Sequence, residues 1–308
     1  MQSFAIGRRR DLLGALALVS LLFCGAGPAA AQQKFMLQLA RPVKIGDQTF
    51  VTQHAKQETI YKTLQGDRVL KENKRTAELN FQGTIETLAV DATGNETRIR
   101  IQIDNFTAKL DDASATDAFK PGSVVLAETV ENKTVYRMID SQEPLPTTQQ
   151  GFMSRLFVTS TGEPTDDEIF AVTEPQAVGG TWPANEELLL KRLLDFDPKL
   201  TTEKISGTGE LLEAPLVDGK QWFHVKFSIH ADSDWPQGGP PETVPLAAEL
   251  NVVVTIRLPA DAAMKATVDR TLDVRRKMQF NGKPDSRFKG LTLQLESHET
   301  RESKTVDR

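Results

Sequence analysis

Cysteine and histidine are scarce in this 308-residue chain, and their scarcity excludes several kinds of site. Cys24 is the only cysteine, and it lies in an N-terminal segment that we expect to be removed, so the mature chain should have no disulfide and no thiol nucleophile. His224 and His230 are the closest two of the four histidines, but within one strand they would lie about 20 Å apart, at about 3.3 Å per residue. One metal ion cannot bind both. We therefore expect no metal site and no cofactor.

The usual motifs of catalysis are also missing. The sequence contains no G-x-S-x-G, no H-E-x-x-H and no glycine-rich phosphate loop. Asp232-Ser233-Asp234 begins like a calcium-binding loop, but Trp235-Pro236 stands where further oxygen ligands and a glycine should follow. We expect a protein that is not an enzyme. A hydrolase whose carboxylates meet only in the folded chain is the third alternative, after the two non-catalytic roles given below.

Long apolar runs and an excess of positive charge are absent after residue 31. No later segment approaches the roughly 18 consecutive apolar residues of a membrane-spanning helix, so we expect no membrane span after cleavage. The complete chain has 37 basic and 42 acidic side chains; removing three arginines and one aspartate with the first 31 residues leaves 34 and 41, a net charge of −7. A mildly acidic chain without a basic stripe argues against nucleic acid as a partner.

The first 31 residues have the three parts of a secretory signal peptide. Arg8-Arg9-Arg10 supplies the positive charge, an apolar run covers residues 12–23, and Ala29-Ala30-Ala31 ends the segment with small residues. Cleavage after Ala31 would make Gln32 the first residue of a periplasmic or secreted protein.

Three alternatives to this cleavage or export route stay open. The segment could be retained as a membrane anchor, although its apolar run is shorter than the about 20 residues of a comfortable span. Arg9-Arg10 also fits a twin-arginine export signal, and Cys24 fits a lipidation site except that the bulky Phe23 precedes it.

Alternation of apolar and polar residues dominates the rest of the chain, and it predicts a mainly β protein. Turn signals such as Gln65-Gly66-Asp67 and Asp218-Gly219-Lys220 separate the alternating stretches. One polar face per strand predicts long antiparallel strands in a curved sheet, a half-barrel or a barrel. The stretches that support this fold class are residues 48–64, 68–90, 98–103, 123–139, 203–213, 222–230, 246–258, 265–281 and 291–296.

The middle of the chain predicts two or three short helices. Gln149 to Val158 spaces its apolar side chains like an amphipathic helix, Thr165 precedes acidic residues as an N-cap, and Glu186 to Phe196 has a leucine face. The expected organisation is a signal peptide at 1–31, a β-rich half at 32–145, the helical middle at 146–200, a second β-rich half at 201–300 and a charged tail at 301–308.

One segment of the helical middle resembles a known group of proteins. Val178-Gly179-Gly180-Thr181-Trp182, followed by a leucine-rich stretch to Leu194, resembles the Val-Gly-x-Thr-Trp segment of exported bacterial β-rich proteins that have no assigned activity. The overall pattern also resembles, in architecture only, the half-barrel lipoprotein carriers, in which a curved antiparallel sheet wraps around helices. These resemblances imply an envelope protein with a curved sheet, and they supply no functional residues.

The sequence favours a non-catalytic envelope protein that binds a lipid, another apolar ligand or an envelope protein partner. Long amphipathic strands and an apolar helical middle would give a concave sheet something to wrap or to release. The alternative is a purely structural or interaction module of the cell surface with a solid core. Trp235, in a loop rich in proline and glycine, is the candidate contact residue for a ligand or partner.

Overall fold

The computed structural model describes residues 33–39, 41, 43–92, 94–131, 133–159, 162, 164–194, 196–236, 239–264 and 267–307. The expected signal peptide and its cleavage site between Ala31 and Gln32 lie outside these residues.

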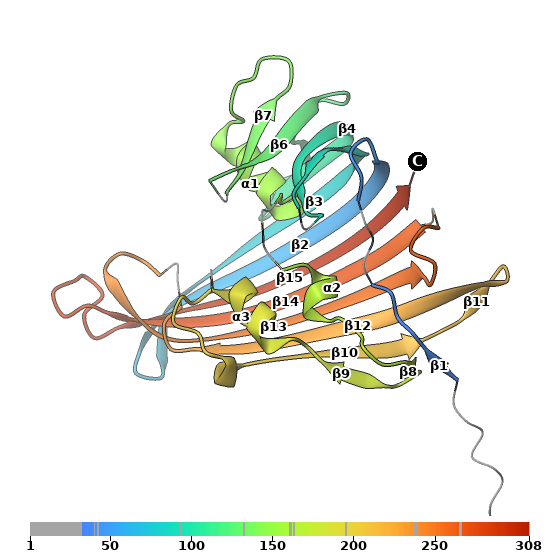
Figure 1. The fold of residues 1–308 in the computed structure, drawn as a ribbon. Helices are drawn as coiled ribbons and strands as arrows, with labels where there is room; N and C mark the ends of the chain where they lie inside the picture. The colour runs from blue at the N-terminus through green and yellow to red at the C-terminus, as the bar shows by residue number, and fades with distance from the viewer. Residues whose placement is uncertain are drawn as a thin grey trace, which may run out of the picture.

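The described residues are mainly in β-strands, with three short helices and a single 3-10 turn between them (Figure 1). The strands are β1 (Lys34–Phe35), β2 (Gln48–Gln65), β3 (Arg68–Val90), β4 (Glu96–Leu110), β5 (Thr116–Asp117), β6 (Val124–Val130), β7 (Lys133–Met138), β8 (Gln176–Ala177), β9 (Thr181–Pro183), β10 (Ile205–Glu213), β11 (Leu216–Val217), β12 (Lys220–Ser233), β13 (Thr243–Pro259), β14 (Thr267–Gly282) and β15 (Thr292–Asp307). The helices are α1 (Thr147–Leu156), α2 (Asp166–Ile169) and α3 (Glu186–Leu193), and the 3-10 turn is η1 (Thr202–Lys204).

One antiparallel, curved sheet contains thirteen of these strands. Its order is β7-β6-β4-β3-β2-β15-β14-β13-β12-β10-β9, with β5 beside β4 and β11 beside β12, while β1 and β8 form a separate pair. Because the path ends at β7 on one side and at β9 on the other, the sheet is open over the described residues. The expected fold class, mainly β with a curved antiparallel sheet and short mid-chain helices, is confirmed in its half-barrel form.

The alternation in the sequence gives the sheet two different faces. Residues directly opposite each other in antiparallel strands share a face, so a chain of such pairs defines a row across the sheet. Glu58, His298, Arg275, Asn251 and His230 form such a row and mark what we call the polar face. Their neighbours along each strand point the other way, toward the face on which the helices pack, which we call the helix-bearing face.

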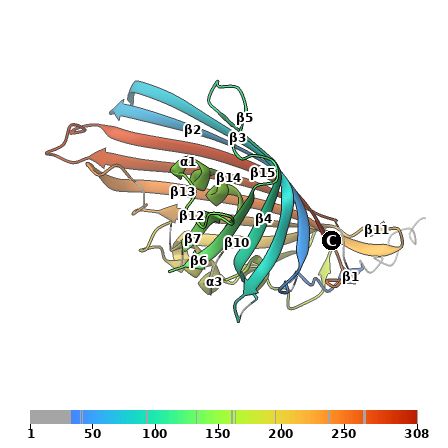
Figure 2. The ribbon, with the colours of Figure 1, turned by 90° about the horizontal axis from the view of Figure 1, so that it is seen from above.

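Two separate covers lie on the helix-bearing face, on the same side of the long strands (Figure 2). Over one end, Met153 and Leu156 of α1 pack with Phe81 and Phe106 of the sheet in a buried cluster. Over the other end, α2 and α3 form a second cluster with the strands from β10 to β13. We call these two covers the α1 cover and the α3 cover.

Trp182, from the Val-Gly-x-Thr-Trp segment at residues 178–182, is buried in the cluster under the α3 cover. Its ring lies so close to Gly209 of β10 that a Cβ added there would lie 2.2 Å from a ring carbon, and its Nε1–H donates a hydrogen bond of 3.0 Å to the carbonyl of Phe170. The absence of a side chain at Gly209 therefore leaves room for the indole ring, and the buried indole N–H has a hydrogen-bond acceptor.

The last strand changes the expected domain organisation. Residues 301–307, expected as part of a charged tail, continue β15, whose residues pair with β2 on one side and, up to Val306, with β14 on the other. A charged strand can occupy the centre of a sheet because the polar face is open to solvent. The first and second β-rich halves consequently share one continuous sheet.

An N-terminal strap, residues 33–39, 41 and 43–47, crosses one end of that sheet (Figure 1). Phe35 packs against Phe223 of the second half, and Gly46 donates a backbone hydrogen bond to Thr87 of the first half. Between them, Arg41 donates hydrogen bonds to the carbonyls of Pro259 and Asp261, and burial lowers the pKa of its guanidinium despite the opposing charges of Asp261 and Asp307. The strap therefore ties both halves together at this end.

Candidate functional site

The helix-bearing face carries a group of apolar side chains outside both covers. Tyr61, Leu295 and Met278 follow one row across β2, β15 and β14, and Thr63, Leu293 and Phe280 follow the next row. Phe196, from the loop after α3, packs on the same group. We call the set Tyr61, Phe196, Met278, Phe280, Leu293 and Leu295 the apolar patch.

The apolar patch is buried at its base and open above. Met278 and Phe280 are buried, at 5% and 3% exposure, and form a small cluster with Ala248 that is distinct from the clusters under the two covers. Leu293, Leu295 and Phe196 are half-buried, and Tyr61 is 46% exposed. The clusters under α1 and under α3 have fully buried centres with partly buried apolar side chains around them, whereas most of the apolar patch is only partly covered.

Trp235 lies in a loop that is fastened beside the apolar patch. The Ser233 hydroxyl donates a buried 2.7 Å hydrogen bond to Asp197, the neighbour of Phe196, and accepts one of 3.0 Å from the Trp235 backbone N–H. Further along the same loop, Gly239 lies against the Phe280 ring, where an added Cβ would approach within 2.3 Å. The Trp235 ring is 41% exposed and has the Lys199 ammonium 3.8 Å from its centre. The sequence-based candidate is therefore an exposed aromatic residue at the border of this patch.

Cationic side chains surround the apolar patch. Lys71 lies opposite Thr63 in the row of Leu293, and Arg276 lies opposite Ser297 in the row beyond Leu295. The Arg276 guanidinium is 5.8 Å from the ring centre of Phe196, an arrangement that places a cation over an aromatic face. Lys71, Arg276 and Lys199 are all exposed.

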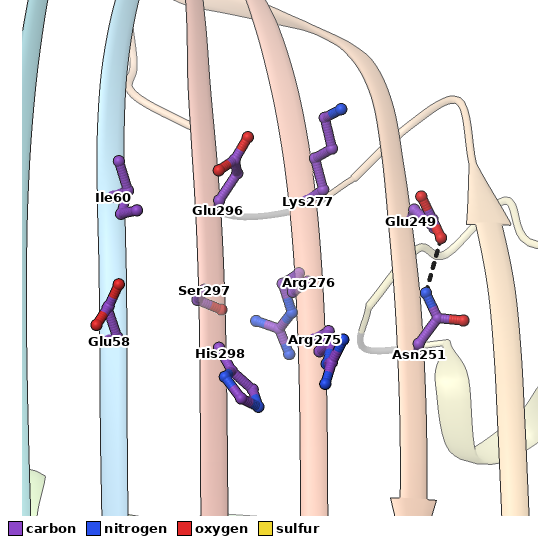
Figure 3. Close-up of a pocket in the computed structure, with 10 residues that line it drawn as sticks. All are labelled: Glu58, Ile60, Glu249, Asn251, Arg275, Arg276, Lys277, Glu296, Ser297 and His298. Atoms are coloured by element: carbon purple, nitrogen blue, oxygen red, sulfur yellow. Dashed lines mark hydrogen bonds between the residues drawn. The ribbon is translucent and has the colours of Figure 1, made fainter.

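The polar face contains a shallow hollow of about 580 Å³ across β2, β15, β14 and β13 (Figure 3). Its lining includes the row of Glu58 and His298, the next row with Glu296 and Lys277, and Arg276 and Ser297, which lie between these two rows along β14 and β15. The view shows the carboxylates spread over several strands instead of meeting at one point.

Ion pairs occupy several of the charged groups in and around this hollow. Glu58 pairs with Lys74 of β3 at 2.7 Å, and Glu296 pairs with Lys62 of β2 at 3.2 Å. These pairs join neighbouring strands, as opposite charges on one face of a sheet commonly do. Exposed pairs of this kind contribute about 0–1 kcal/mol each to the free energy of unfolding.

Three histidines on the polar face, His54, His230 and His298, hydrogen-bond to carboxylates or amides. Burial raises the pKa of Asp273, but the hydrogen bond from His298 at 3.0 Å, together with Arg275, outweighs it and leaves that pKa below its ordinary value. The pKa of His230 is raised by its hydrogen bond with Asn251 at 2.8 Å and by Asp232, against a smaller effect of burial. His224 lies on the same face of β12 as His230, six residues away, as the alternation predicted. Within the described part of the chain, no group of three or more His, Cys, Asp or Glu residues is placed to hold a metal ion.

No helix among the described residues is both long and apolar enough to cross a membrane.

Of the residues in and beside the apolar patch, the sequence singles out Trp235, from its loop, and its alternation places Leu293 and Leu295 on one face. Tyr61 and Phe196 do not stand out in the sequence, because their exposure depends on where the two covers end. The only sequence signal for them is an aromatic residue in phase with the apolar face of a strand or next to a helix end.

Comparison with solved structures gives distant structural likenesses, of which two are described here. No family model matches the chain, and no curated protein matches it. A structure described as lipid–protein interactions in lipovitellin aligns at 9% identity with a TM-score of 0.30, over 84% of this chain and 25% of that one. Pseudomonas aeruginosa OpdQ aligns at 9% identity with a TM-score of 0.19, over 84% of this chain and 98% of that one. The chain spans about a quarter of the lipovitellin length, and likenesses at these scores support no shared function.

Proposed function

We propose that this protein is an exported, non-catalytic binding protein that holds an apolar ligand on the apolar patch. One observation carries the proposal: Leu293, Leu295, Phe196 and Tyr61 remain partly exposed above a buried base, outside the buried centres of the clusters under the two covers. The N-terminal segment with the features of a signal peptide supports export to the periplasm or the exterior.

The energetics of burial favour a ligand at this position. Covering apolar surface contributes about 25 cal/mol per Å², and contiguous exposed apolar patches on monomeric proteins commonly mark interaction sites. Met278 and Phe280 at the base are fixed by the sheet and by the Gly239 loop, so a ligand would meet a surface that is already formed. Binding to a formed surface has a lower entropic cost than binding to a mobile one.

A protein partner is the second candidate, and a different observation favours it. β4 pairs with β3 only from Ala77 onward, so residues 68–76 of β3 have a strand partner on the β2 side alone, within the described sheet. Asp111 occupies the end of this open edge through hydrogen bonds with Thr76. An extended segment of another protein can pair with such an edge.

Binding of the neutral apolar fluorophore N-phenyl-1-naphthylamine to the purified mature protein tests the first candidate. We expect saturable fluorescence enhancement that falls at least tenfold in affinity in Tyr61→Ser and Leu295→Ser. Ile60→Ser is the matched control, because Ile60 is the neighbour of Tyr61 on β2 but lines the hollow of the polar face. Its affinity should equal that of the unmodified protein.

Two results contradict the proposal. The unmodified protein could fail to bind the fluorophore, or Ile60→Ser could weaken binding as much as Tyr61→Ser does. In either case the open edge of β3 becomes the leading candidate, to be tested by pull-down with residues 68–76 replaced.

A further inference from the structure

The apolar patch is small on the side that a ligand can reach. Its two members on β14 are buried, and the other four supply the accessible surface. These four are Tyr61, Phe196, Leu293 and Leu295. Leu293 and Leu295 lie two residues apart on β15, about 7 Å, and Tyr61 lies one strand away, about 5 Å. The accessible apolar surface is therefore compact both along the strands and across them.

Polar residues close the apolar patch toward the centre of the sheet. In the next row inward, Thr59 on β2, Ser297 on β15 and Arg276 on β14 lie directly opposite one another, and we call these three residues the polar border. The row behind it continues with Gln57 opposite Glu299. An apolar chain that extended inward would take these polar groups out of water and offer them no hydrogen bond in return, which is unfavourable.

Both sides of the apolar patch are closed as well. On β3, Asn73 lies opposite Tyr61, and Lys71 lies opposite Thr63. On the other side, Phe196 packs both on the patch and on the cluster under the α3 cover, so that the patch ends at covered surface. The direction of the turn between β14 and β15 remains, and both strands end within two residues of the patch.

We infer that the group held on the apolar patch is compact, about the size of one or two aromatic rings, and is not the long acyl chain of a membrane lipid, with Thr59 and Ser297 limiting its length. The inference rests on the proposed function and specifies the ligand class. An acyl chain spans about half of a bilayer core of about 30 Å, which is roughly twice the distance between the two rows of the patch. Aromatic rings suit this surface, because Tyr61 and Phe196 can contact a ring with a stabilisation beyond that of the buried area.

Displacement of bound N-phenyl-1-naphthylamine by hexanol, octanol, decanol and dodecanol, each below its solubility, tests this limit. The four alcohols are uncharged and differ only in length, and each added methylene that finds an apolar contact should raise the affinity about fourfold. We expect this increase from hexanol to octanol. The affinities for decanol and dodecanol should lie within about threefold of that for octanol, because their further methylenes would lie over the polar border or in water.

Variants assign the limit to the polar border. Thr59→Leu combined with Ser297→Leu adds an apolar row, so the affinity should continue to rise through dodecanol while the affinity for hexanol stays unchanged. The matched control is Lys56→Leu combined with Thr300→Leu, because Lys56 and Thr300 lie directly opposite each other on the polar face of the same two strands. This control should keep the limit at octanol. If the leucines disturb the sheet and hexanol binding is lost, Thr59→Val combined with Ser297→Val makes the same comparison with side chains that suit a strand.

The failures can be told apart. Affinity that rises fourfold per methylene through dodecanol in the unmodified protein overturns the inference and leaves the proposed function standing. A limit that stays at octanol in the border variants, or that moves equally in the control, also overturns the inference, because the polar border would not be its source. Absence of fluorophore binding overturns the proposed function and the inference together.

Discussion

Tyr136 is a buried polar residue whose ionisation is coupled to folding. It lies on β7 at 3% exposure, and its hydroxyl donates a hydrogen bond to the carbonyl of Phe157, just after α1. Burial raises the pKa of Tyr136 to about 12 from an ordinary value of 10, with a smaller opposing effect of Thr134. The neutral phenol therefore fastens the α1 cover to the sheet.

We expect the free energy of unfolding of the unmodified protein to fall as the pH rises above 10. In the unfolded chain the phenol ionises near its ordinary pKa of about 10, while in the folded protein it stays neutral until about pH 12. The stabilisation is fully present below pH 10 and falls as the pH rises toward 12. Urea unfolding from pH 8 to 12 measures it, and the difference between the unmodified protein and Tyr136→Phe isolates the tyrosine from the lysines. An equal pH dependence in both proteins would refute the coupling.

At the scale of single residues, the sequence predicted which way side chains point better than how exposed they are. Trp182, which the sequence linked to a resembling segment, is buried against Gly209, and Trp235 is exposed, as its loop indicated. The exposure of Tyr61 could not be predicted, because Tyr61 and the buried Ala55 have the same phase on β2. What separates them is the α1 cover, which ends between them and comes from a distant part of the chain.

Helix α3 is the element for which the sequence was most informative. The expected helix, Glu186 to Phe196, is observed as Glu186–Leu193, with Asn185 as its N-cap through a hydrogen bond from Leu188. The helix ends three residues earlier than expected because the backbone N–H groups of Phe196 and Asp197 both turn back to the carbonyl of Leu193. Phe196 is thereby released from the helix and joins the apolar patch.

Replacing single leucines of α3 with alanine should lower the free energy of unfolding more on its buried side than on its half-buried side. Leu189 is fully buried at 0% exposure, so Leu189→Ala should lower the free energy of unfolding by about 2–5 kcal/mol. Leu190 is only half-buried, so Leu190→Ala should cost clearly less, about 1 kcal/mol or below. Urea unfolding of both variants gives the comparison, and equal losses would show that the helix is rotated relative to the face described here.

Over the whole molecule, β15 joins two halves that the sequence presented as separate. Each half forms its own antiparallel hairpins, and the two meet where β15 pairs with β2 from Thr292 opposite Leu64 to Asp307 opposite Thr49. Alternation predicted the last strand but could not predict its partners, since a period of two describes a face and contains no information on pairing. For the same reason, the charged residues 301–307 read as a tail when they are a central strand.

Removing β15 should therefore damage the molecule more than removing a tail would. A chain that stops after Leu291 leaves β2 and β14 as long open edges, and open edges promote pairing between molecules. We expect this variant to form aggregates in size-exclusion chromatography under conditions in which the complete protein elutes as a discrete species. A truncated chain that remained discrete and unfolded cooperatively would show that the halves are independent.

The position of β15 also governs the order in which the protein can fold. Synthesis proceeds from the N-terminus, so β2 can pair early with β3, while its second partner, β15, is the last strand to arrive, after everything from β3 to β14. Pairings between such distant segments are slow, and the open edge of β2 can associate wrongly with other chains until β15 pairs with it. The time during which β2 lacks β15 increases with the length of chain between the two strands. An insertion in a loop of the helical middle would prolong it without touching either strand.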